Sequence, residues 1–426
     1  MHARYKKKGE THMKKFLCLM TLFVMVIGVA AAHADGLTGE LTIASRYTGV
    51  QGEAFESIIE GFKAENPGVK VENQTFTDNY EDVMKVNMSG KQLPDVFMTH
   101  GWSIMRYKEY LLPLNDEPWA KDIVPGLFGS IMDADGKIYV LPNTNAMTGV
   151  LVQNGLLKEL GLEIPKTVED FLHCCQVAKE KGYIGVYCAG KDTRSPAYVL
   201  NLMAPSFLLN SADAAEIGAS LQDGSFDWNK WAAVNEFLMQ LKDNGYLNVD
   251  CATADTANMS ETLVAKESLF IFQRSSVLIE AWDIDPEADL GFIPMPAKDA
   301  NDEPYLVGGE SQAFGIWKDS KNIEAAKAFL AYMARPENIK LISEVCGEAP
   351  GLQGVEVDSG NLTPWFEAWA NTKVQPWFDR VYLPSGMWAI MRDTGSGLIG
   401  GETTIEKACE TMKANYEKLR SQNTQN

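Results

Sequence analysis

The residues of this sequence that could bind a ligand are led by its tryptophans, of which there are ten, all beyond residue 34. Trp102 follows a short apolar stretch and lies two positions after His100. A second group stands nearer the C-terminus and consists of Trp365, Trp369, Trp377 and Trp388. Flat aromatic rings can cover the apolar C–H faces of a sugar ring, although most tryptophans in proteins belong to the core. For each of these side chains, ligand contact and core packing are therefore alternatives.

Further candidates are Arg46, Tyr80, Asn145, Arg274, Gly309 and Glu310. All of them except Arg274 lie in loops that follow predicted strands. Guanidinium, amide and carboxylate groups exchange hydrogen bonds with hydroxyls, and open α/β sheets bind ligands beyond the carboxyl ends of their strands. We predict that one ligand site contains these residues and four others, namely His100, Trp102, Trp365 and Trp388. Arg274 and Asn145 could equally be structural residues held by hydrogen bonds.

Other chemistries lack the residues that they need. Beyond residue 34 only His100 and His173 remain, so a zinc site built from several histidines is not expected. Neither histidine has a Gly-x-Ser-x-Gly nucleophile motif near it. The letters Gly395-x-Gly397-x-x-Gly400 match a dinucleotide fingerprint, but no βαβ unit surrounds them. We predict no catalytic residue, no metal and no cofactor, although a pair of catalytic carboxylates among the many acids remains an alternative.

Strands and helices alternate along the chain, which is typical of an α/β protein. Residues 41–44 predict a strand, and apolar residues within 55–62 recur at the spacing of one helix face. Residues 69–71 predict the next strand and residues 95–98 a buried one, so this region has a βαβ pattern with parallel pairing. A second α/β region follows Thr167, which can cap a helix.

The N-terminus has the pattern of a secretory signal peptide. A basic segment precedes the apolar residues 16–29, and Ala32-His33-Ala34 is a small-x-small cleavage site. The apolar run is short for a membrane span, and no cysteine stands after it where a lipid anchor would attach. We expect residues 1–34 to be removed and the protein to be secreted, to a periplasm or the cell surface. An uncleaved signal anchor remains an alternative.

Charge and cysteine content restrict the partners further. The formal net charge is −19, which disfavours nucleic acid as a partner because such binding depends on Lys and Arg neutralising phosphates. Six cysteines lie beyond the predicted signal peptide, too sparse for a disulfide framework, although some could pair. We interpret the adjacent Cys174 and Cys175 as packing residues of a helix.

Several segments stand in a recognisable order along the chain, namely residues 62–71 (FKAENPGVKV), 93–97 (LPDVF), 136–142 (GKIYVLP), 157–171, 308–309 (GG) and 325–330 (AAKAFL). In this order they resemble the extracellular solute-binding proteins of sugar ABC transporters, family 1, of the maltose-binding-protein kind. The resemblance covers nearly all of the chain beyond the predicted signal peptide. Each motif alone is common, but their shared order is specific.

The resemblance implies a two-lobed periplasmic-binding-protein fold of type II, with a mainly parallel sheet flanked by helices in each lobe and hinge crossings between them. The expected parts are the signal peptide (1–34), an N-terminal lobe (35–146 plus 307–345), a C-terminal lobe (147–306 plus 346–420) and a disordered tail (421–426). It also implies a monomer that captures a sugar between the lobes and delivers it to a membrane ABC transporter permease.

One departure from the family pattern concerns the ligand. The family usually has Gly and Trp near the positions of Ser275 and Ser276, so a stacking platform is missing here or has moved, for example to Trp282. The same fold with a non-sugar solute and a secreted carbohydrate-active enzyme therefore remain alternatives.

Overall fold

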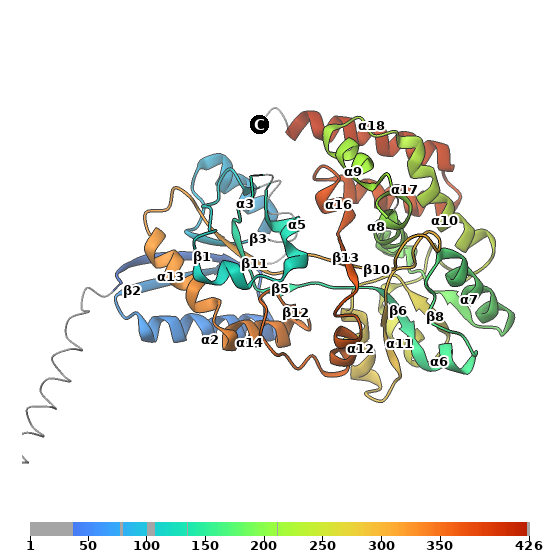
Figure 1. Cartoon of the computed structure of the whole chain (residues 1–426), viewed down its shortest axis with the longest axis horizontal. Helices are drawn as coiled ribbons and strands as arrows, with labels where there is room; N and C mark the ends of the chain where they lie inside the picture. The colour runs from blue at the N-terminus through green and yellow to red at the C-terminus, as the bar shows by residue number, and fades with distance from the viewer. Residues whose placement is uncertain (1–36, 77–79, 100–106, 134, 211, 424–426) are drawn as a thin grey trace, which may run out of the picture.

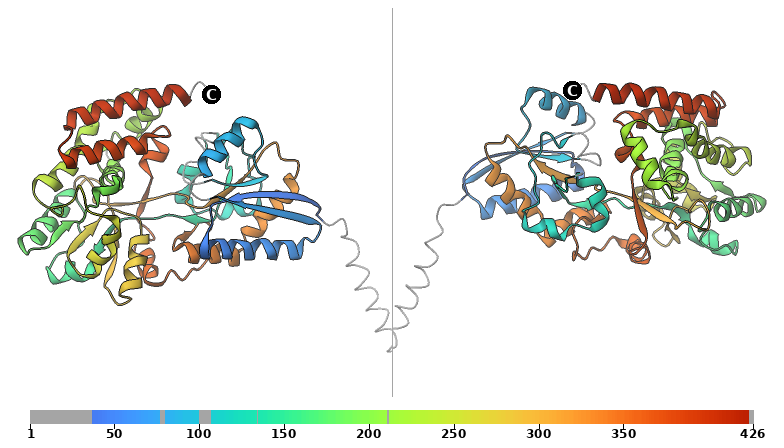
Figure 2. Two further views of the ribbon diagram at one scale, coloured as in Figure 1. Left: turned by 180° about the vertical axis from the view of Figure 1, so that it is seen from behind. Right: turned by 45° about the horizontal axis from the view of Figure 1, so that its top comes forward.

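Two hydrophobic cores divide the protein into two lobes that lie side by side (Figure 1). The computed structural model describes residues 37–76, 80–99, 107–133, 135–210 and 212–423. The first core is built from residues 41–141 and 313–352, and the second chiefly from residues 150–307 and 377–416. Both lobes therefore combine segments that are distant in the sequence. Both views in Figure 2 show the lobes as separate bodies joined by slender crossing segments.

The first lobe has a five-stranded sheet with helices around it. In sheet order its strands are β2 (Val69–Thr75), β1 (Gly39–Ser45), β3 (Val96–Thr99), β11 (Ala313–Ile316) and β4 (Val140–Pro142). Its helices are α2 (Gly49–Glu65), α3 (Tyr80–Gly90), α5 (Phe128–Ile131), α13 (Ile323–Met333) and α14 (Pro336–Cys346). The predicted apolar stripe of α2 is confirmed, because Phe55, Ile58, Ile59 and Phe62 are all buried.

The second lobe has a four-stranded sheet and more helices. In sheet order its strands are β7 (Ile184–Val186), β8 (Ser268–Ile271), β6 (Val150–Gln153) and β9 (Leu290–Ile293). Its helices are α6 (Asn154–Glu159), α7 (Val168–Glu180), α8 (Arg194–Leu208), α9 (Ala214–Asp223), α10 (Ala232–Asp243), α11 (Met259–Val264), α12 (Ser276–Ile284), α15 (Thr363–Ala368), α16 (Phe378–Val381), α17 (Met387–Gly400) and α18 (Ile405–Asn423).

The two sheets are mixed, which corrects the expectation of mainly parallel sheets. The predicted βαβ pattern is confirmed, because β1 pairs in parallel with both β2 and β3. However, β11 is antiparallel to β3 and β4, and β6 is antiparallel to β8 and β9. β6 and β11 each follow directly on a segment that crosses between the lobes. They therefore enter their sheets in the direction opposite to that of the strands beside them.

Short strand pairs connect the lobes. β5 (Thr144–Asn145) pairs antiparallel with β12 (Ala349–Pro350), and β10 (Tyr305–Gly308) pairs in parallel with β13 (Lys373–Pro376). Because β10 pairs with β13, Val307 packs in the second core although it was predicted in the first lobe. Leu352 packs in the first core, where it forms an antiparallel bridge with Ile123, although it was predicted in the second lobe.

The C-terminal helix is longer than predicted. α18 continues to Asn423, so it includes the first three residues of the predicted disordered tail. Its apolar face reaches far along the helix, since Ala408, Met412 and Tyr416 are all buried in the second core. None of the helices in the described part of the chain is both long and apolar enough to span a membrane.

The cysteines of the described residues are all free thiols, and most are buried. Cys174 and Cys175 lie on α7 in the second core, as predicted for packing residues. Burial raises the pKa of both thiols, to about 11 for Cys174. A raised pKa leaves little thiolate at neutral pH, which makes these side chains unreactive.

Thr167 begins α7 as predicted. Its hydroxyl accepts a hydrogen bond from the backbone N–H of Asp170, and the Asp170 carboxylate accepts one in return from the backbone N–H of Thr167. We expect Thr167→Ala to lower the free energy of unfolding by about 1 kcal/mol, because a cap is lost. Urea denaturation measures this change, with Thr167→Ser as the control that keeps the hydroxyl. An unchanged midpoint for Thr167→Ala would contradict the prediction.

Candidate functional site

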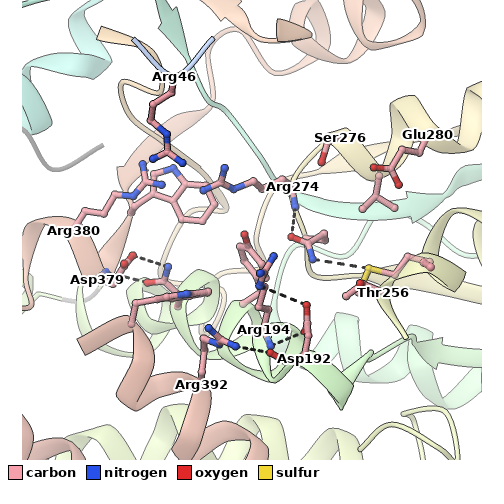
Figure 3. A pocket seen from close by; sticks show the side chains of 18 residues that line it. Arg46, Asp192, Arg194, Thr256, Arg274, Ser276, Glu280, Asp379, Arg380 and Arg392 are labelled. Atoms are coloured by element: carbon pink, nitrogen blue, oxygen red, sulfur yellow. Dashed lines mark hydrogen bonds and ion pairs between the residues drawn. The ribbon is translucent and has the colours of Figure 1, made fainter. Parts of the chain in front are cut away.

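A cavity of about 770 Å³ lies where the second lobe faces the first (Figure 3). Ligand cavities in proteins commonly have volumes of about 300–1,000 Å³. Most of its lining comes from the second lobe, while Arg46, directly after β1, comes from the first. The lining residues discussed below are Arg46, Asp192, Arg194, Tyr198, Asn201, Arg274, Glu280, Trp377, Asp379, Arg380, Trp388 and Arg392.

Two packed helices form much of the wall. Arg194, Tyr198 and Asn201 are spaced by four and three positions, which places them on one face of α8. Trp388 and Arg392 are spaced by four positions on α17, and the rings of Trp388 and Tyr198 meet edge to face with centroids 5.2 Å apart. Gly395 allows the close approach of the two helices, because a Cβ atom there would lie 3.1 Å from Pro196. Gly395, in the glycine-rich segment of α17, thus serves helix packing.

A short segment near the C-terminus supplies the centre of the wall. Trp377, Asp379 and Arg380 all belong to α16 or its N-cap. The preceding strand β13 pairs with β10, which ties this segment to the interlobe crossing. Phe378 is fully buried, and its ring lies 5.6 Å from that of Trp231. The buried Phe378 therefore anchors α16 while its neighbours line the cavity.

Asp379 is held by a reciprocal pair of hydrogen bonds. The Nδ2 of Asn201 donates to the Asp379 carboxylate at 2.8 Å, and the backbone N–H of Asp379 donates to Oδ1 of Asn201 at 3.0 Å. Burial raises the pKa of Asp379, and the nearby charge of Arg380 partly opposes this rise. The carboxylate is thus fixed in position while it faces the cavity.

Arg274 and Arg380 approach each other across the same indole ring (Figure 3). Their guanidinium carbons lie 5.6 Å and 5.0 Å from the ring centroid of Trp377, a distance at which a cation is attracted to the ring. Burial lowers the pKa of Arg380, and the positive charge of Arg274 lowers it further. Two cations therefore share one aromatic surface in the cavity.

Other charged groups of the wall are paired within the protein. Arg392 donates from Nε to Oγ1 of Thr193 at 2.9 Å and from NH2 to the carbonyl oxygen of Asp192 at 2.7 Å. Arg194 lies 3.5 Å from the Asp192 carboxylate. These contacts connect the start of α8 with α17 and hold this part of the cavity wall in position.

Two carboxylates lie at the interlobe crossing behind the cavity. The hydroxyl of Thr144 in β5 donates to Oε2 of Glu348 at 2.6 Å, and burial raises the pKa of Glu348. Glu310 is only 1% exposed, and its backbone forms an isolated antiparallel β-bridge with Asn145. Its negative charge partly opposes the lowering of the Arg380 pKa.

Three of the predicted site residues line the cavity. They are Arg46, Arg274 and Trp388. Tyr80 lies beneath Arg46, whose guanidinium is 5.9 Å from the Tyr80 ring, but the tyrosine is buried and donates its hydroxyl hydrogen to the Met98 carbonyl. The structure thus brings Tyr80 next to the site without placing it in the lining.

The remaining predicted residues lie at other places. Asn145, Gly309 and Glu310 belong to the crossing segments, and a Cβ atom at Gly309 would lie 3.6 Å from the Trp377 ring. Trp365 packs in the second lobe, so close to β9 that a side chain at Gly291 would collide with its ring. Trp282, considered as a replacement platform, donates its Nε1 hydrogen to the Ala288 carbonyl and packs in the second lobe. His100 and Trp102 lie outside the described residues.

The prediction missed most of the charged wall, including Asp379, Arg380 and Arg392. A signal was present in the sequence, since Trp377 stands beside an acid and a base in the segment W-F-D-R. Among the described residues, no group of three or more His, Cys, Asp or Glu side chains could hold a metal ion. The site is suited to binding through aromatic rings, cations and carboxylates.

Comparisons with known proteins agree with this architecture. A family model described as bacterial extracellular solute-binding protein matches residues 48–340. The melibiose/raffinose/stachyose-binding protein MelE of Bacillus subtilis (strain 168) is 31% identical over 411 residues, which are 96% of each chain. The match to MelE thus extends over both lobes.

Solved structures give the same result. A binding protein from Bacillus subtilis subsp. subtilis str. 168 in an open conformation matches with a TM-score of 0.86 at 31% identity, over 91% of this chain and 99% of that one. A sugar transporter protein from Bacillus licheniformis in complex with stachyose matches with a TM-score of 0.76 at 32% identity, over 89% and 100%. At nearly equal identities, the score is higher for the structure in an open conformation than for the stachyose complex. The chain belongs to the bacterial extracellular solute-binding proteins and has their two-lobed fold.

Proposed function

We propose that this protein captures an α-galactoside oligosaccharide outside the cytoplasm and delivers it to an ABC transporter permease. Melibiose, raffinose and stachyose are named for a relative with 31% identity over almost the whole chain, and stachyose is bound in a structure with 32% identity. The observation that carries the proposal is the interlobe cavity, which combines the Trp388 ring with fixed carboxylate and guanidinium groups. Such groups match the apolar faces and the hydroxyls of sugar units.

The proposed mechanism is closure of the two lobes around the sugar. Because Arg46 faces the cavity from the first lobe and Trp388 from the second, a ligand that contacts both favours a closed arrangement. The similarity to an open structure is consistent with a ligand-free state that is ready to bind. The permease would then recognise the closed pair of lobes.

Three further points belong to the same proposal. We place the divisions between the lobes near residues 146, 306 and 346. The ligand site contains Arg46, Arg274 and Trp388 together with Asp379 and Arg380 of the second lobe. The protein acts as a monomer and releases its sugar unchanged, so incubation with labelled oligosaccharides should yield no cleavage product.

We expect raffinose or stachyose to raise the melting temperature of the purified protein, because a ligand that binds only the folded state stabilises it. Intrinsic fluorescence should change as well, since Trp377 and Trp388 line the cavity. Sucrose, which is raffinose without its galactosyl unit, is the matched control and should give a smaller shift. If sucrose and maltose stabilise the protein and no α-galactoside does, the proposed ligand class is wrong.

A further inference from the structure

Arg274 and Arg380, which we call the guanidinium pair, differ from the other arginines of the cavity in their hydrogen bonding. Among the described residues, Nε of Arg274 is buried without a hydrogen-bond partner, and the Arg380 guanidinium makes no hydrogen bond or ion pair. Guanidinium groups carry five N–H donors, and burying such donors without acceptors is unfavourable. Nε of Arg274 is therefore an unsatisfied donor in the ligand-free protein, while both guanidinium groups line the cavity.

Arginines elsewhere in the described part of the chain have partners. Arg392 in the same cavity donates to Thr193 and Asp192. Arg335 in the first lobe also stacks on an aromatic ring, with its guanidinium carbon 4.3 Å from the Tyr332 centroid, but it donates twice to Glu65 at 2.7 Å. Stacking on a ring thus does not prevent an arginine from pairing. The missing acceptors are a property of this particular place in the cavity.

The charges around the guanidinium pair indicate which acceptors would fit. Three carboxylates, those of Asp192, Glu280 and Asp379, line the same cavity, and the buried Glu310 acts on Arg380 from behind. Five arginines line it as well, namely Arg46, Arg194, Arg274, Arg380 and Arg392, so charged groups of both signs face the ligand space. A hydroxyl group suits such a site, because it accepts a hydrogen bond from a guanidinium and donates one to a carboxylate.

We propose that the guanidinium pair determines the specificity of the cavity for a neutral sugar unit, by donating to neighbouring hydroxyl oxygens while Asp379 accepts from a hydroxyl of the same unit. Both guanidinium carbons lie within 5.6 Å of the ring centroid of Trp377, which is only 3% exposed, so both sets of donors gather at one buried ring. The hydroxyl oxygens of the ligand supply the hydrogen-bond acceptors that the two guanidinium groups lack in the free protein. This inference rests on the proposed function and names the residues that select the sugar.

The test compares Arg274→Gln and Arg380→Gln with Arg335→Gln. The first two variants should raise the Kd for stachyose in calorimetry by about 10- to 100-fold, the usual range for a hydrogen bond to a charged group. Their melting temperatures without ligand should be equal to or above that of the wild type, because the substitutions remove no hydrogen bond of the guanidinium groups within the protein. Arg335→Gln should do the opposite: it should lower the melting temperature and leave the Kd unchanged.

Arg380→Lys adds a second check of the same idea. Lysine keeps the charge but lacks the planar fork of donors, so the Kd should rise nearly as much as with glutamine. Wild-type protein should also bind melibiose more tightly than melibionate, its carboxylate-bearing derivative. Tighter binding of melibionate would show that the pair recognises an anion, and this would overturn the inference.

Two other results would also overturn it. One is a Kd within twofold of the wild type for both glutamine variants. The other is a ligand-free melting temperature that falls in these variants as far as in Arg335→Gln, which would make the pair structural. If wild-type protein binds no α-galactoside, the proposed function fails instead, and the ligand-free melting comparison with Arg335→Gln still decides whether the pair is unsatisfied in the free protein.

Discussion

Replacing Trp231 by alanine should lower the free energy of unfolding of the second lobe by about 3–5 kcal/mol, the usual cost of removing a large aromatic side chain from a core. Trp231 is 0% exposed and lies between Trp228 and Phe378, with ring centroids 6.2 Å and 5.6 Å away. Because Phe378 anchors α16, sugar binding should weaken as well. Urea denaturation followed by circular dichroism measures the first effect, and calorimetry measures the second.

Trp231→Phe is the control for this prediction. Among the described residues the indole N–H of Trp231 has no hydrogen-bond partner, so phenylalanine removes packing volume and no hydrogen bond. We expect a clearly smaller loss of stability than with alanine. Equal losses in the two variants would mean that packing volume at Trp231 does not determine the stability of this core.

Asp379→Asn should raise the Kd for stachyose by about 10- to 100-fold, since a hydrogen bond to a carboxylate is replaced by one to a neutral amide. At neutral pH the same substitution should stabilise the folded protein, although it weakens binding. Burial raises the pKa of Asp379 in the folded protein. Between the unfolded and folded pKa values the folded state therefore binds more protons, and the free energy of unfolding falls as the pH rises through this window.

The asparagine variant lacks this titration, so its stability relative to the wild type should increase from pH 3 to pH 7. Glu65→Gln is the matched control. The hydrogen bond from Arg335 holds the pKa of Glu65 below its usual value, so this variant should lose stability relative to the wild type as the pH rises. It should not change the Kd. If both variants follow the same pH trend in their melting temperatures, the assigned environment of Asp379 is wrong.

The sequence predicted those features that depend only on residues close together in the chain. The buried stripe of α2 and the cap at Thr167 are defined by spacings of three or four residues, and both are present. Arg46 and Arg274 could be proposed because each follows a strand closely, and strand ends of an α/β sheet point to the ligand. These features need no knowledge of distant contacts.

The rest of the site depends on long-range pairing. Asp379 and Arg380 reach the cavity because β13 pairs with β10, roughly seventy residues earlier in the chain, and nothing in the local sequence of α16 reveals that partner. Trp365 was predicted in the site for its residue type, but it packs over the small surface that Gly291 leaves on β9. The directions of β6 and β11 depend on how the chain crosses between the lobes. Local sequence does not show this, and so the mixed sheets were not predicted.

The composition of the second core has a consequence for how this chain acquires its structure. That core joins Val150 near the first crossing with Tyr416 near the end of the chain. Such distant partners must find each other before the lobe gains its packing energy, and chains with many non-local contacts fold slowly. Synthesis of all but the last forty residues would therefore leave the second lobe without α17 and α18, so its core can be completed only when nearly the whole chain has been made.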